Sequence, residues 1–252
     1  MVPQWSDPQT PASDNRLNFS RALDEAGAAC DGWRVNIALT SAIDSFALPA
    51  LSLEAGSARL GGVVVIQEIF GLTEHVAEMC ATFAEAGYAV LAPSLFERVE
   101  ANFHADMSPE GVQKGLAAVR ACSWNQVASD VQAAIDALPK PVYVTGFCYG
   151  GAVSWLAAAR CVGVSATSCF YGRLIADMLD EKPKAPVMLH YGARDHSIPM
   201  ERIERVRAAA PNSPLYLYDA GHGFCRTASG DFDAPARDLA ISRTLDWFAR
   251  WR

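Results

Sequence analysis

The sequence lacks the features that mark membrane, secreted and metal-binding proteins. No stretch reaches the roughly 18 to 20 uninterrupted apolar residues that a membrane span needs. The N-terminal segment is polar and has no apolar core of a signal peptide, which favours a cytoplasmic protein. The 7 cysteines are scattered, and no two form a Cys-x-x-Cys pair, so neither a disulfide framework nor a zinc site is indicated. We therefore expect no metal ion and no cofactor.

The sequence is also poor in positive charge. The formal net charge is -7, and no stripe of Lys and Arg offers neutralisation of phosphates, which argues against a nucleic-acid partner. Hydrophobic residues make up 51% and charged residues 19%, which is ordinary for a globular protein. A chain of 252 residues is long enough for one large domain with a substantial core.

The chain divides into an N-terminal arm and one expected domain. Residues 1–32 carry prolines among Asp, Asn and Ser, and we expect them to form an arm outside the core. Residues 33–252 alternate apolar runs with segments of helical period, which predicts a single α/β domain with a mostly parallel, doubly wound sheet flanked by helices. The expected strands are 61–67, 88–92, 141–145, 164–171, 185–191 and 215–218, and the expected helices cover 76–83, 127–138, 152–161 and 239–248.

A cysteine stands at a junction from strand to helix. Gly146-Phe-Cys-Tyr-Gly150 follows the strand at 141–145 and precedes an apolar helical run, which is the Gly-x-nucleophile-x-Gly pattern of an α/β-hydrolase with Cys148 in place of serine. The glycines are needed because side chains two positions from the nucleophile would collide with neighbouring backbone. The helix dipole favours the thiolate form of the cysteine. The alternative is an ordinary turn that contains an incidental buried cysteine.

Two further residues follow Cys148 in the chain order of α/β-hydrolases, which is nucleophile, acid and histidine. Asp195 lies just beyond the strand at 185–191, and His222 lies just beyond the strand at 215–218. Both belong to loops at the carboxyl ends of strands, where such sheets hold their active sites. We expect Asp195 to orient His222 and His222 to act as the base for Cys148. His196 is the local alternative, but we interpret it as a loop-fixing residue because it is adjacent to Asp195.

Backbone donors for an oxyanion are expected on two sides of the cysteine. One is the N–H of Tyr149, directly after Cys148, and the other is the N–H of Ile69 in the loop after the first expected strand. Glu68 stands in the same loop, and a carboxylate at the end of a buried strand is costly unless it is paired. It is either a structural ion-pair partner or a second base near the thiol.

Four segments together resemble the dienelactone hydrolase (carboxymethylenebutenolidase) family over roughly residue 33 to the C-terminus. They are Gln67-Glu-Ile-Phe-Gly71, Gly146-Phe-Cys-Tyr-Gly-Gly151, Asp195-His196 with Pro199, and Gly221-His-Gly-Phe224 with Arg226. The resemblance implies an ester or lactone hydrolase of the carboxymethylenebutenolidase class that forms a thioester on Cys148. It also implies that Glu68 holds or deprotonates the thiol until substrate displaces it.

The expected ligand is a small-molecule ester or lactone, which is anionic if Arg226 matches the arginine that binds a substrate carboxylate in the family. The family's second substrate arginine has no counterpart in Ser108–Gly115, where only Lys114 is nearby. A lysine is a point charge and a poor substitute for a bidentate guanidinium. This departure weakens dienelactone itself as the substrate and leaves ester or lactone hydrolysis intact.

Other functions stay open at this point. A broad carboxylesterase or thioesterase would use the same three residues. A non-catalytic protein of the hydrolase fold would bind a small ligand without turning it over. A redox sensor would oxidise Cys148 without ester turnover, although no resolving cysteine lies close in sequence.

Overall fold

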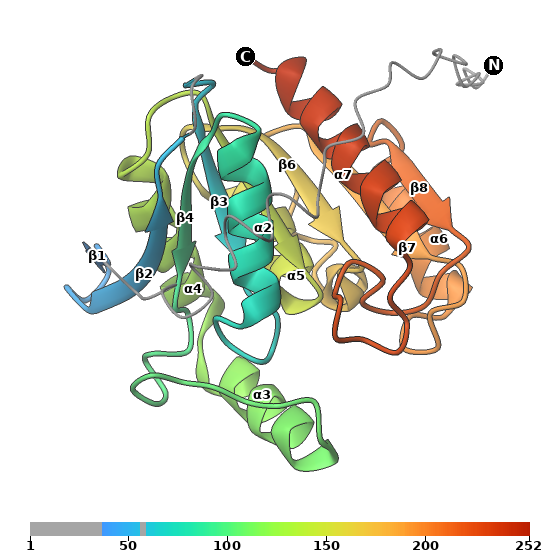
Figure 1. The fold of residues 1–252 in the computed structure, drawn as a ribbon, viewed down its shortest axis with the longest axis horizontal. Helices are drawn as coiled ribbons and strands as arrows, with labels where there is room; N and C mark the ends of the chain where they lie inside the picture. The colour runs from blue at the N-terminus through green and yellow to red at the C-terminus, as the bar shows by residue number, and fades with distance from the viewer. Residues whose placement is uncertain (1–36, 56–58) are drawn as a thin grey trace. The chain divides into compact units, whose positions relative to one another are not determined.

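A computed structural model describes residues 37–55 and 59–252, so the predicted arm at residues 1–32 lies outside the described residues (Figure 1). An eight-stranded sheet has the order β1-β2-β4-β3-β5-β6-β7-β8. The strands are β1 (Ile37–Thr40), β2 (Ala47–Leu53), β3 (Gly62–Ile66), β4 (Ala89–Pro93), β5 (Val142–Phe147), β6 (Val164–Phe170), β7 (Val187–Gly192) and β8 (Leu215–Tyr218). All neighbouring pairs from β4 to β8 are parallel, while β2 is antiparallel to both β1 and β4. The predicted α/β class with a mostly parallel sheet is confirmed.

Helices cover both faces of the sheet (Figure 1). They are α2 (Glu74–Glu85), α3 (Pro109–Ala121), α4 (Trp124–Asp136), α5 (Tyr149–Arg160), α6 (Met200–Ala209) and α7 (Ala234–Ala249), with a short 3-10 helix η1 (Arg173–Asp177). In β3, Val63 and Val65 belong to one buried cluster and Val64 and Ile66 to the other, because successive side chains of a strand point to opposite faces. This explains why β3 is apolar at every position from Val63 to Ile66. Of the helices among the described residues, none is long and apolar enough to cross a membrane.

The sequence analysis predicted β3 to β8 and missed β1 and β2 at one edge of the sheet. β8 has the predicted bounds, and β3, β4, β5, β6 and β7 lie within two residues of theirs. β1 and β2 were not predicted, since both alternate apolar and exposed positions too irregularly to show a strand period. Gly87 follows the C-cap residue of α2 with φ 99°, the left-handed conformation in which glycine commonly ends a helix.

The order of the strands reverses at β3, which pairs with β4 on one side and with β5 on the other. The next strands along the chain after β5 continue outward on that side. Ile66 at the end of β3 lies opposite Gly146 near the end of β5. The loops that leave these two strands therefore start side by side, at the switch point where open α/β sheets bind their ligands.

His190 is a buried residue of β7, and both of its ring nitrogens contact hydroxyl groups of the neighbouring strands β6 and β8. Its Nδ1 atom is 2.8 Å from the Tyr218 hydroxyl, and its Nε2 atom is 3.1 Å from the Ser168 hydroxyl. The ring also stacks on Phe170, with centroids 4.5 Å apart. Burial, assisted by the positive charge of Arg243, lowers the pKa of His190 from 6.5 to about 3. The imidazole is therefore neutral in the folded protein at any physiological pH.

A neutral buried histidine makes the fold sensitive to acid. Because the unfolded chain takes up a proton near pH 6.5 and the folded chain does not do so until about pH 3, stability falls with pH between these values. At pH 5 the loss from one such histidine is about 2 kcal/mol. We expect His190→Gln to reduce the difference in unfolding free energy between pH 7 and pH 5 by about that amount, measured by urea denaturation. His104→Gln, at an exposed position, is the control. Equal pH dependence in wild type and His190→Gln would contradict the assignment.

Candidate active site

Cys148 occupies a strained turn between β5 and α5. Its φ is 54° and its ψ is -110°, a region that non-glycine residues rarely enter and that costs of order 1–3 kcal/mol. The Cys148 N–H donates to the Phe170 carbonyl of β6 at 3.0 Å. The strained backbone is thus anchored to the next strand, and the cysteine is held at the carboxyl edge of the sheet with its side chain partly exposed.

The turn closes only because two glycines flank it. A Cβ atom on Gly146 would lie 2.3 Å from the Gly150 carbonyl oxygen, and one on Gly150 would lie 2.4 Å from the Ile66 carbonyl oxygen. The obstacles are backbone atoms that cannot move aside. The collision expected from the sequence is therefore confirmed, and the same contact brings the start of α5 against the end of β3.

Asp195 and His222 come together from the loops after β7 and β8. The Nδ1 atom of His222 lies 2.6 Å from Oδ2 of Asp195. Oδ1 of Asp195 accepts from the backbone N–H of Ser197 at 2.8 Å and of Ile198 at 3.2 Å. The Asp195 side chain is fully buried, while the His222 side chain is 23% exposed. This pairing was predicted from chain order alone.

The charges around His222 stabilise its protonated form. Burial disfavours the imidazolium, but the negative charge of the Cys148 thiolate and hydrogen bonds to Asp195 and Cys148 outweigh it and raise the pKa of His222 from 6.5 to about 10. The pKa of Asp195 is lowered, because hydrogen bonds from His222 and Ser197 outweigh the opposing effect of burial. The surroundings of this pair therefore favour an imidazolium hydrogen-bonded to a carboxylate.

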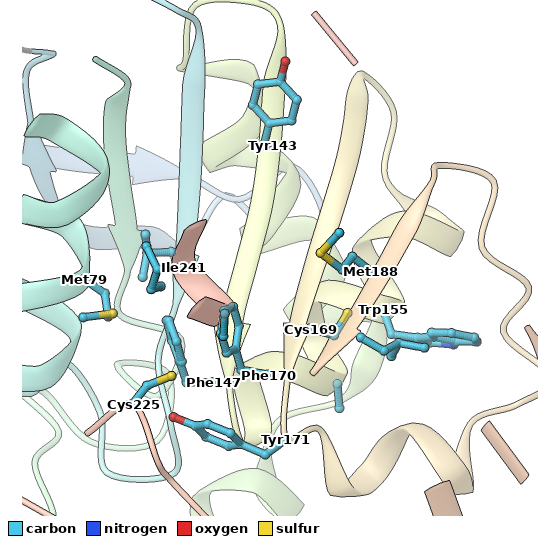
Figure 2. Packing of buried hydrophobic residues seen from close by; sticks show 14 of the residues in the cluster. Met79, Tyr143, Phe147, Trp155, Cys169, Phe170, Tyr171, Met188, Cys225 and Ile241 are labelled. Carbon is cyan, nitrogen blue, oxygen red and sulfur yellow. The ribbon is translucent and has the colours of Figure 1, made fainter. Parts of the chain in front are cut away.

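Tyr171 packs with its ring against the ring of His222. It follows β6 directly, has φ 36°, and its ring centroid lies 5.1 Å from that of His222 and 5.3 Å from that of Phe224. Figure 2 shows its side chain below Phe147 and Phe170, with the hydroxyl toward Cys225. Tyr171 was not predicted as a site residue, because only the packing of the end of β6 against the loop after β8 brings it to His222.

Glu68 and Arg226, identified separately in the sequence, form an ion pair. Arg226 Nη1 lies 2.7 Å from Glu68 Oε2, and the Glu68 side chain is fully buried while that of Arg226 is 14% exposed. The guanidinium also lies over the Phe70 ring, 5.4 Å from its centroid. Burial disfavours the charged arginine, but the charge of Glu68 and its hydrogen bond, with a further contribution from Cys148, raise the pKa of Arg226. Oε1 of Glu68 is buried and has no hydrogen-bond partner.

The two expected oxyanion donors belong to chain segments that lie against each other, the start of α5 and the loop after β3. Tyr149 is the first residue of α5, and its ring is buried against Trp124, with centroids 6.0 Å apart. The loop of Ile69 leaves β3, whose last carbonyl touches Gly150. The loop after β3 is held further by the Gln67 side chain, whose Oε1 atom accepts from the Leu95 N–H at 3.0 Å.

The remaining candidates lie away from the cysteine or have other contacts. Lys114 Nζ lies 2.9 Å from Glu100 Oε1 and 2.9 Å from the His104 carbonyl, so its charge is already engaged. His196 and His104 are exposed. His75 is buried with an edge-to-face contact to Phe147, and burial lowers its pKa to about 4. Within residues 37–55 and 59–252, no cluster of three His, Cys, Asp or Glu residues could hold a metal ion.

One functional contact was missed by the sequence reasoning. The Ser197 hydroxyl lies 2.7 Å from Asp195 Oδ1 and 3.0 Å from His222 Nδ1. The sequence analysis interpreted His196 as the loop-fixing residue, whereas the hydrogen bonds to the Asp195 side chain come from Ser197. The available signal was the spacing Asp-x-Ser, which is typical of a turn closed by an Asp side chain.

The chain is similar to known proteins over most of its length. The model of the dienelactone hydrolase family matches residues 48–251. A Salmonella typhimurium protein named "Putative carboxymethylenebutenolidase" is 34% identical over 221 residues, which cover 79% of this chain and 80% of that protein. Carboxymethylenebutenolidase 1 of Cupriavidus pinatubonensis is 32% identical over 199 residues, covering 74% and 85%. The crystal structure of a "Putative Dienelactone Hydrolase" from Klebsiella pneumoniae superposes with a TM-score of 0.72 at 29% identity, covering 85% of this chain and 99% of that one.

The ion pair between Glu68 and Arg226 generates a stability prediction. Removing one partner of a buried pair leaves an uncompensated charge, whereas removing both does not. We expect Arg226→Met to lower the unfolding free energy by about 3 kcal/mol and Glu68→Gln/Arg226→Met to recover most of that loss. Urea denaturation of the two single variants and the double variant measures the coupling. Additive effects of the two substitutions would contradict a buried pair.

Proposed function

This chain belongs to the dienelactone hydrolase family and is a carboxylic ester hydrolase, and on that premise we propose that it cleaves a small-molecule ester or lactone through Cys148, His222 and Asp195. The observation that carries the proposal is the 2.6 Å hydrogen bond between His222 and Asp195 beside a cysteine held at a strained strand-to-helix turn. A nucleophile, a base and a group that orients the base are the parts that acyl transfer requires.

The first half of the reaction forms a thioester. The Cys148 thiolate attacks the carbonyl carbon, and the carbonyl electrons move to oxygen, where the N–H groups of Tyr149 and Ile69 donate to the oxyanion. The intermediate then collapses and expels the alkoxide. His222 donates its Nε2 proton to this leaving oxygen, so that an alcohol departs, or stays attached if the substrate is a lactone. A thiolate suits this substrate class, because a departing alkoxide competes with it better than an amine does.

The second half hydrolyses the thioester with the same histidine. The thiolate charge is the largest of the influences that raise the pKa of His222, and acylation removes it. The neutral imidazole left after the first half can therefore take a proton from water as hydroxide attacks the thioester carbon. Collapse of this second intermediate restores the thiolate and releases the carboxylic acid. The balance is ester plus water to acid plus alcohol.

Glu68 is proposed to hold the thiol proton of Cys148 before substrate binds. Three facts support this role: the carboxylate is buried, its Oε1 atom has no hydrogen-bond partner, and the charges of Glu68 and Cys148 both act on Arg226. The Glu68 carboxylate holds this proton by accepting a hydrogen bond from the thiol. When a substrate draws Arg226 and Glu68 away, the thiol proton passes to Nε2 of His222, which produces the thiolate and the imidazolium without a change of net charge in the site.

Arg226 is proposed to bind an anionic group of the substrate. The Arg226 side chain is 14% exposed, its guanidinium lies over Phe70, and Nη1 contacts Glu68, so part of this buried cation still reaches the surface. Because Lys114 is engaged by Glu100, this arginine is the cation that we assign to the substrate. Because this one cation is also the partner of Glu68, we expect the enzyme to prefer substrates with at most one negative charge over lactones with several.

The nucleophile is tested by covalent trapping. We expect Cys148→Ala to lower kcat/KM for an activated ester such as p-nitrophenyl acetate by at least about 1000-fold, because the acyl acceptor is lost. Mass spectrometry of quenched wild-type enzyme should show the acyl group on the peptide that contains Cys148. Cys161→Ala, which changes a partly buried thiol on the far end of α5, is the matched control and should retain wild-type activity. Turnover by Cys148→Ala at the wild-type rate would rule out the mechanism, and stoichiometric binding without turnover by wild type would favour a ligand-binding protein.

Arg226 is tested by a ratio of substrates. We compare a carboxylate-bearing ester with its neutral methyl ester in Glu68→Gln and in Glu68→Gln/Arg226→Met, so that effects of Glu68 cancel. Loss of the guanidinium should lower the anionic-to-neutral ratio of kcat/KM about tenfold, which corresponds to one charge-assisted hydrogen bond. An unchanged ratio would show that Arg226 has no contact with the anionic group.

A further inference from the structure

Ser197 closes a triangle of hydrogen bonds with Asp195 and His222. Its Oγ atom donates to Asp195 Oδ1 at 2.7 Å and lies 3.0 Å from His222 Nδ1. The third side is the 2.6 Å bond between His222 Nδ1 and Asp195 Oδ2. Since the hydroxyl proton points to the carboxylate, the lone pairs of Oγ are free to face the N–H of the imidazole.

The two oxygen atoms of Asp195 have separate tasks in this arrangement. Oδ1 accepts from the Ser197 hydroxyl, from the Ser197 N–H at 2.8 Å and from the Ile198 N–H at 3.2 Å. Oδ2 accepts from His222. Three donors on one oxygen fix the plane of the carboxylate, so the other oxygen meets the histidine in one direction.

The hydroxyl does more than close the turn. The turn itself is held by the two backbone N–H groups, which do not depend on the side chain at position 197. The same motif occurs at the start of α3, where the Ser108 N–H donates to Asp106 Oδ1 at 3.0 Å and the Ser108 hydroxyl also contacts that oxygen. Ser108 caps a helix there by accepting from the Gly111 N–H. Ser197 instead has a histidine within reach.

We propose that Ser197 is a positioning residue of the hydrolase, which locks the Nδ1 side of the His222 ring so that Nε2 faces Cys148. The proposal rests on the proposed function of Cys148, His222 and Asp195. Ser197 does not touch the reacting atoms. It acts through its two partners, by holding the carboxylate with its proton and the imidazole N–H with its lone pairs. A ring that could tilt away from Asp195 would deliver its proton to the leaving oxygen less often.

Kinetics of Ser197→Ala, Ser197→Thr and Ser108→Ala test the proposal. We expect Ser197→Ala to lower kcat for p-nitrophenyl acetate about three- to tenfold. KM should stay within twofold because the residue does not bind substrate. Ser197→Thr keeps the hydroxyl and has room for its methyl group at an exposed position, so kcat should be restored. Ser108→Ala removes the equivalent hydroxyl from the turn without a histidine and should leave kcat unchanged.

A spectroscopic measurement separates positioning from a change in the loop. The His222 Nδ1 proton gives a low-field proton NMR signal if it lies in a short hydrogen bond to a carboxylate. In Ser197→Ala, Asp195 is the remaining acceptor for this proton. Asp195 also loses the hydrogen bond from the Ser197 hydroxyl, so it becomes a stronger acceptor. The signal should therefore move downfield in Ser197→Ala and return in Ser197→Thr.

The outcomes distinguish this proposal from the one on which it rests. Wild-type kcat in Ser197→Ala, or equal loss in Ser197→Ala and Ser197→Thr, would overturn the role of the hydroxyl while leaving the nucleophile intact. A fall in kcat with an unmoved proton signal would also overturn it, because the effect would then come from the loop. Full activity of Cys148→Ala would instead refute the catalytic assignment itself, whatever the behaviour of position 197.

Discussion

The close approach of α5 to the ends of β3 and β5 is the constraint on which the rest of the site depends. A helix can begin immediately after β5 only if no side chain stands at Gly146 or Gly150, where backbone oxygens occupy the space of a Cβ atom. The same tight turn forces Cys148 into a conformation with φ 54°. Because the loop after β3 touches Gly150, its position follows from the turn as well. The backbone strain at Cys148 is thus the consequence of bringing the cysteine, the start of α5 and the loop after β3 close together.

Two pairs of oppositely charged side chains interact with the cysteine. Glu68 and Arg226 are both largely buried, and their charges cancel at short range. Asp195 and His222 form the second pair, with the carboxylate buried and the imidazole partly exposed. Among the groups around His222, a negative charge on Cys148 is the influence that raises the pKa of the histidine most.

Much of this arrangement follows from local sequence patterns, and the parts that do not follow share a physical cause. Apolar runs and turn residues predicted β3 to β8, because buried parallel strands are apolar at nearly every position. Chain order predicted that Asp195 and His222 would meet. The contact of Glu68 with Arg226 joins residues 158 positions apart and depends on packing that no local pattern encodes. Ser197 was missed because the spacing Asp-x-Ser indicates a turn but does not show that a histidine from another loop lies within reach of the serine.

Comparison of three histidines shows that environment and not residue type selects the acid–base group. His75 and His190 lie among apolar side chains, and burial lowers their pKa values to about 4 and about 3. Burial also disfavours the charged form of His222, yet its pKa is raised to about 10 because the charges of Cys148 and Asp195 and hydrogen bonds to both outweigh that effect. One of these partners, Asp195, keeps its charge throughout the proposed cycle, while the other loses its charge on acylation. An imidazole between a permanent anion and a transient one is an acid when the transient charge is present and a base when it is absent. In the proposed cycle the cysteine therefore controls the proton affinity of the histidine, and His222 can activate water only after the acyl group has been transferred to Cys148.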